Sequence, residues 1–191
     1  MVDYTKMSLP DARRDYLANS TTAMPIGGLI AWSLLAIALF AFSDHLPPWA
    51  PFVAAALPVP IALLIDKVRG TIGVWSQGND NPIAKLFLQS IWIITLLIPL
   101  LFIAAQQSGD ADLLVLGMGI LAGVVWVPHG WGANDPAGFR HFLMRAVLCY
   151  AVYLFAPEPI RGAAIAAAVA AIYIYALIAM KKPQSARSAE S

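Results

Sequence analysis

Charge is scarce in this chain of 191 residues, since Asp, Glu, Lys and Arg together make up only 12% of it. A typical soluble domain is about 25% charged. Cysteine is rarer still: Cys149 stands alone, so no disulfide can form within the chain and no CxxC motif exists. The three histidines lack the spacing of metal ligands. We therefore expect no metal, no cofactor and no catalytic residues, and the sequence contains neither an H-E-x-x-H motif nor a Ser-His-Asp order that would indicate an enzyme.

Apolar residues are abundant instead: they make up 60% of the chain, and the mean hydropathy of the chain is +0.71. A soluble protein of this size could not bury so much apolar surface, which excludes a soluble enzyme, a nucleic-acid binder and a disordered regulator. Crossing a bilayer takes about 20 helical residues, and none of the apolar runs alternates in polarity as a barrel strand does. We predict an all-α bundle of six transmembrane helices, at 25–42, 49–65, 83–105, 113–127, 139–156 and 159–180.

Positive charge orients the predicted bundle. Of the 12 lysines and arginines, all except Arg161 fall on one side of this topology. The positive-inside rule then places both termini in the cytoplasm. The sequence thus predicts a multi-pass protein of the cell membrane, typical of a bacterial inner membrane. Its parts are a cytoplasmic segment at 1–24, a transmembrane domain at 25–182 and a disordered cytoplasmic tail at 183–191.

The segment before the first apolar run reads SLPDARRDYLANS. Ser8 and Asp11 have the spacing of a capping box, and Leu9, Ala12 and Tyr16 share one helical face. We expect a short amphipathic helix lying on the inner membrane surface, with a mobile leader as the alternative.

Two polar links resemble each other. Both place a tryptophan, a glycine and an Asn-Asp pair before a proline that opens an apolar run, at 75–82 and 130–136. Asn or Asp caps free helical amides, and proline at the first helical position loses no hydrogen bond. The similarity indicates either three repeated hairpins of one orientation or the reuse of common capping chemistry.

These links also hold most of the polar side chains near the membrane. If the links meet, they form a polar, Trp-walled mouth on the cytoplasmic side that could bind a small molecule or a lipid headgroup. The alternative is helix capping with Trp anchoring at the lipid interface. The candidate residues are Asp66, Trp75, Asn79, Asp80, His129, Trp131, Asn134, Asp135, His141 and Arg145.

Arg145 is the charge that lies deepest within a predicted span. Two readings are open: it points inward and pairs with Asp66 or Asp135, or its stem snorkels so that the charge reaches the interface. Otherwise the spans hold almost no charge at mid-depth, which argues against an ion-coupled pump.

Small residues predict where helices pack closely. Gly119 and Gly123 form a small-xxx-small pair, Gly117 lies beside them, and a four-residue spacing relates Ala163, Ala167 and Ala171. Packing within one bundle and formation of a homo-oligomer are both open as uses of these residues. Pro58 and Pro60 fall in mid-span, where they should loosen the helix and provide a gate or a cavity wall.

The segments LPDARRDY, GNDNP and HGW resemble an uncharacterised family of small bacterial six-helix membrane proteins, a domain of unknown function. The resemblance implies the six-helix fold over most of the chain and assigns no activity. Two functions stay open. The protein binds or passes a small or lipidic solute without ion coupling, or it is an accessory, scaffold or stress-related protein that contacts lipid or a partner. The expected partners are therefore the lipid bilayer and a small-molecule or lipid ligand, without nucleic acid.

Overall fold

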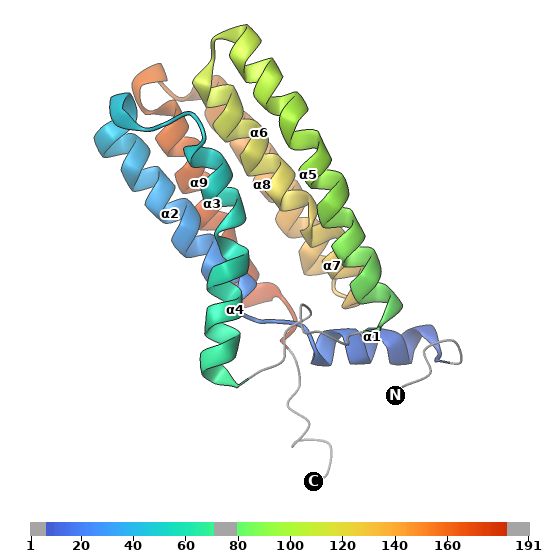
Figure 1. The fold of residues 1–191 in the computed structure, drawn as a ribbon. Helices are drawn as coiled ribbons and strands as arrows, with labels where there is room; N and C mark the ends of the chain where they lie inside the picture. The colour runs from blue at the N-terminus through green and yellow to red at the C-terminus, as the bar shows by residue number, and fades with distance from the viewer. Residues whose placement is uncertain (1–6, 71–79, 183–191) are drawn as a thin grey trace.

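The computed structural model describes residues 7–70 and 80–182, and all of the regular structure within them is helical (Figure 1). In chain order the helices are α1 (Leu9–Ala18), α2 (Met24–Phe42), a 3-10 turn η1 (Ser43–His45), α3 (Ala50–Ala56), α4 (Pro58–Arg69), α5 (Pro82–Ser108), α6 (Ala111–Val124), α7 (Trp126–Gly132), α8 (Pro136–Phe155) and α9 (Glu158–Ala179). The all-α prediction is confirmed for this part of the chain. The predicted tail lies outside the described residues.

Five stretches are long and apolar enough to cross a membrane: α2, α3 with α4, α5, α6 with α7, and α9. The fifth predicted span corresponds to α8, which has 20 residues and includes Arg140 and Arg145. Its composition does not mark it as a span, although it packs against both α6 and α9. The count of six spans therefore stays a prediction, as do the three repeated hairpins.

Two spans are interrupted by prolines. Leu57 separates α3 from α4 and Val125 separates α6 from α7, and both residues keep right-handed helical dihedrals. Pro58, Pro60 and Pro128 follow these breaks and have no N–H to donate, so the carbonyls four residues earlier lose their helical partners. The helix is loosened at 57–60, as predicted. The stretch at 128–138 is not the loop that was expected, because α7 continues to Gly132.

Close packing in the bundle depends on glycines at helix crossings. A Cβ on Gly28 of α2 would lie 2.2 Å from the Tyr173 ring of α9, and one on Gly117 of α6 would lie 2.2 Å from the Leu101 side chain of α5. Gly119 faces Val169 of α9, and Gly123 makes room for the Arg145 side chain. The three glycines predicted to pack helices therefore face α5, α9 and α8.

The predicted alanine stripe on α9 packs within the bundle at only one of its three positions. Ala163 is buried, whereas Ala167 and Ala171 are exposed. Steps of four residues advance by about 400°, so the stripe drifts around the helix by about 40° per step. The buried face instead alternates steps of three and four, through Ala163, Ala166, Ala170 and Tyr173.

Helix capping follows the sequence prediction. The Asn81 side chain accepts from the Ile83 N–H at the start of α5, and the Asp135 side chain accepts from the Ala137 N–H at the start of α8. Ser8 caps α1 in the same way. Asn81 and Asp135 each also bind a second part of the chain. Asn81 donates to the Ala12 carbonyl of α1 at 2.8 Å, and Asp135 accepts from the backbone N–H of Lys181 at 2.7 Å.

Helix α1 lies across the end of the bundle where α5 begins and α9 ends (Figure 1). Tyr16 anchors it, because its side chain is fully buried and its hydroxyl shares a 2.9 Å hydrogen bond with Nδ1 of His129 in α7. Burial raises the pKa of Tyr16, so the phenol stays neutral. Leu9, predicted on the same face, is exposed. The helix therefore packs on α5 and α7 through Ala12 and Tyr16.

Candidate functional site

A cavity of about 600 Å³, here called the chamber, lies between the loosened α3–α4 stretch, α5 and α6. Its lining residues are apolar except for Thr95, Trp126 and Tyr173. Residues 55–60 contribute their side chains at the break between α3 and α4, so the prolines that loosen this span also shape the wall. The volume lies within the range of about 300–1,000 Å³ that small-molecule sites occupy.

The chamber does not continue to the far end of the bundle. A separate cavity of about 260 Å³ lies there, near Asp112, and shares no lining residue with the chamber. The Phe52 and Phe102 rings pack between α3 and α5 with their centroids 5.9 Å apart. The chamber and this second cavity are therefore separate.

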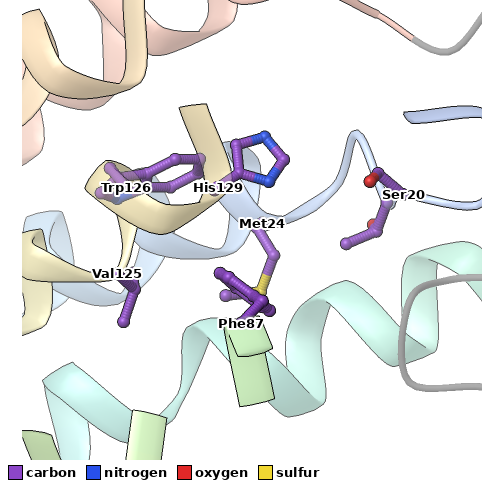
Figure 2. Close-up of a pocket in the computed structure, with 7 residues that line it drawn as sticks. Ser20, Met24, Phe87, Val125, Trp126 and His129 are labelled. Atoms are coloured by element: carbon purple, nitrogen blue, oxygen red, sulfur yellow. The ribbon is translucent and has the colours of Figure 1, made fainter. Parts of the chain in front are cut away.

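At the other end the chamber narrows to a cavity of about 20 Å³, here called the neck (Figure 2). Met24, Phe87, Val125 and Trp126 line both the chamber and the neck. Ser20, Thr21 and His129 line the neck but not the chamber, so the wall of the neck is more polar than that of the chamber. A space of this size admits a single file of atoms.

A third cavity, of about 40 Å³, continues from the neck, with which it shares Thr21, Trp126 and His129. It is here called the basic mouth, because Lys181 and Lys182 line it. Thr22 adds a further polar side chain, and the rest of the lining is apolar: Pro25, Ala176, Leu177 and Met180. The neck thus shares lining residues with the apolar chamber and with the basic mouth.

Arg145 lies behind the chamber wall, in the interior of the bundle. Its side chain is fully buried, with Nε donating to the Gly119 carbonyl and Nη1 donating to the Tyr173 hydroxyl at 3.1 Å. The guanidinium also lies 5.3 Å from the Trp32 ring centroid and 5.2 Å from that of Tyr173. Snorkelling is therefore ruled out, and neither predicted carboxylate is its partner. The bundle instead solvates the cation with a helical carbonyl, a phenol and two ring faces.

Several polar atoms around Arg145 have no hydrogen-bond partner among the described residues. They are Nη2 of Arg145, both ring nitrogens of His141, and the indole nitrogens of Trp32 and Trp126. The His141 ring lies 5.0 Å from the Trp126 ring and 5.3 Å from the Tyr173 ring. Buried groups of this kind usually find a partner, and most of these atoms are donors. The polar end of the site therefore favours an acceptor.

The predicted cytoplasmic mouth is only partly assembled. His129, His141 and Arg145 approach one another through Trp126 and Tyr173, while Asp135 is engaged as a cap. The other described candidates have separate roles: Asp80 pairs with Lys85 at 3.0 Å, Asn134 accepts from Arg13, Trp131 lies under the Arg13 guanidinium, and Asp66 is buried at the end of α4. Trp75 and Asn79 lie outside the described residues.

Sequence reasoning missed three contributors to the site: Trp126, Lys181 and Lys182. In the sequence, Lys181 and Lys182 indicated only the orientation of the chain, although their position directly after the last apolar run predicts that they lie at a helix end. Trp126 carries a local signal, because an indole inside an apolar run has an N–H that needs a partner. No local pattern reveals that it lines all three cavities.

Five helices able to cross a membrane, built around an apolar compartment, are the marks of a helical membrane protein. The chain belongs to a family of unknown function, DUF7010, which it matches over residues 11–182. The resemblance to an uncharacterised family is thereby confirmed. No curated protein matches the chain, and no solved structure does.

Proposed function

We propose that this protein is a multi-pass membrane protein that binds an amphiphilic or lipidic molecule in the chamber. The observation that supports this most is the 600 Å³ apolar chamber itself, which is lined by helices long and apolar enough to cross a membrane and by Trp126 and Tyr173. An amphiphile has the same division into a tail and a head.

Binding fits better than ion-coupled transport. None of the residues that line the chamber is ionisable at neutral pH. The Phe52 and Phe102 rings pack against each other between α3 and α5, and the cavity near Asp112 is separate from the chamber. The proposed role is therefore capture or presentation of a lipidic molecule, without catalysis.

We also propose that α8 is a sixth span and that both termini are cytoplasmic. Helix α8 packs against α6, α7 and α9, which places it inside the bundle. The charge of Arg145 makes the composition of α8 less apolar than that of a typical span. Because Arg145 is buried against α6 and α9, this charge does not face lipid. The chamber then opens through the neck toward the cytoplasmic face.

Filling the chamber tests the proposal. In native mass spectrometry of protein released from mild detergent, we expect the parent to retain a single-chain amphiphile. Ala122→Phe places a ring in the chamber and should abolish the retained mass. Ala167→Phe, on the exposed face of α9, is the matched control and should keep it. Equal retention by both variants, or no adduct in the parent, would favour the accessory role.

A further inference from the structure

We infer that the amphiphile of the chamber is anionic and single-chained, with its head in the basic mouth and its tail passing through the neck. This inference rests on the proposed function and goes further, because it assigns the charge of the ligand and the place of its head. The observations that carry it are the lining residues that neighbouring cavities share and the charges at the mouth.

The neck limits the ligand to one chain. The neck shares Met24, Phe87, Val125 and Trp126 with the chamber, and it shares Thr21, Trp126 and His129 with the mouth. A cavity needs about 10–15 Å³ to hold one water molecule, so the neck, with a volume of about 20 Å³, has no room for two parallel chains. Figure 2 shows the side chains that enclose this space.

The tail alone cannot select a ligand. Lipid chains are as apolar as the chamber lining, so moving a tail from the bilayer into the chamber gains little free energy. Selectivity and most of the affinity must therefore come from the head. The residues around the head then decide which amphiphiles bind.

The charges at the mouth favour an anion. Lys181 and Lys182 line it, and Arg69 reaches its edge by donating to the Thr22 hydroxyl at 3.5 Å. The Asp135 carboxylate lies beside Lys181 and already accepts from the Lys181 N–H and the Ala137 N–H. The Lys181 ammonium donates to the Asn134 carbonyl at 2.6 Å and has two more protons to donate. The balance at the mouth is positive.

Two further features point the same way. The indole N–H of Trp126 is buried, lacks a hydrogen-bond partner among the described residues, and belongs to a side chain that lines mouth, neck and chamber. An indole is only a donor, so it needs an acceptor. Arg145, which has no carboxylate partner, adds positive potential behind Tyr173 at the same end of the chamber.

The chemistry shared by the expected ligands is an alkyl chain ending in an anionic group, either a carboxylate or a phosphate. The test uses the protein in nanodiscs of neutral phosphatidylcholine, with radiolabelled hexadecyl phosphate as the probe. Unlabelled palmitate, hexadecyl phosphate, hexadecylphosphocholine and hexadecanol compete, so that the head varies while the chain stays constant. We expect both anions, or one of them, to compete at least tenfold better than the zwitterion and the alcohol. Preference for palmitate identifies a fatty acid, and preference for hexadecyl phosphate identifies a phosphate head.

Variants that remove positive charge test whether the head of the ligand lies in the basic mouth. Lys181→Gln/Lys182→Gln should weaken binding of the probe about 25-fold, at about fivefold per lysine. Lys182→Gln alone should weaken it about fivefold and disturbs no contact of the fold. The control, Lys67→Gln/Lys85→Gln, removes the same charge from the same end of the bundle outside the mouth and should change binding less than twofold.

The outcomes separate the two proposals. If the alcohol competes as well as the anions, or if both lysine pairs have equal effects, the anionic ligand is refuted, while loss of binding in Ala122→Phe still upholds the chamber. If Ala122→Phe binds every competitor like the parent, the proposed function itself fails.

Discussion

The position of the Tyr173 ring can be tested through a single methyl group on α2. Alanine at Gly28 would place Cβ 2.2–2.6 Å from three atoms of that ring, so the ring must move. Tyr173 cannot move freely, because it holds Arg145 by a hydrogen bond and packs edge-on against Trp126 at 6.1 Å. The change therefore strains the end wall of the chamber.

The expected cost follows from these contacts. Overpacking a buried site costs about 1–3 kcal/mol, and losing a hydrogen bond to a charged group costs about 1.5–3 kcal/mol. Replacing glycine by alanine in a helix raises the free energy of unfolding by about 1 kcal/mol. Gly28→Ala should thus lower the free energy of unfolding by about 2–5 kcal/mol. Gly119→Ala, whose Cβ would meet only Val169 at 3.2 Å and two atoms beyond 3.7 Å, should change it by less than about 1 kcal/mol.

A double-mutant cycle measured by denaturant unfolding in detergent isolates the contact. In a Tyr173→Leu background the ring is gone, so Gly28→Ala should become neutral or stabilising. The coupling free energy should then exceed about 2 kcal/mol. A coupling near zero would refute the described contact between α2 and α9, and with it the position of the end wall.

Three further changes test the polar end. Tyr16→Phe leaves Nδ1 of His129 buried without its partner, so the free energy of unfolding should fall by about 1–3 kcal/mol and amides of α1 should exchange faster in hydrogen–deuterium exchange; unchanged exchange would contradict the anchor. Asp135→Ala removes a cap and should lower stability to urea by about 1–2 kcal/mol, which Asp135→Asn should largely restore. Arg145→Met loses hydrogen bonds but also a buried cation, so thermal unfolding should show a net change within about 2 kcal/mol; a loss above about 4 kcal/mol would show that the cation is a main structural support.

Features that depend on neighbours in sequence could be predicted. Asn81 and Asp135 cap helices because a side chain reaches the N–H two residues ahead, and Pro58 and Pro60 break a span because they lack an N–H. The N-terminal helix was likewise predicted from its cap and its apolar face.

Features that depend on partners distant in sequence could not be predicted. Two readings were open for Arg145, snorkelling or pairing with a carboxylate, yet its partners are a carbonyl 26 residues away and a hydroxyl 28 residues away. The four-residue alanine spacing described a local pattern, whereas the burial of Ala166 and Ala170 depends on where α2 and α8 cross α9. The chamber arises from the separation of α3 and α4 from α5, which no single segment encodes.

Photolabelling would test the central claim most directly, because it reports where the tail lies. Palmitate carrying a diazirine at its chain end is added to the protein in neutral nanodiscs, and the labelled residues are mapped by peptide mass spectrometry. We predict labels on chamber residues such as Ile94, Met118 and Leu121, competed by excess palmitate and lost in Ala122→Phe. Labels confined to exposed apolar residues of α5, such as Leu96 and Leu100, and resistant to competition would contradict the account.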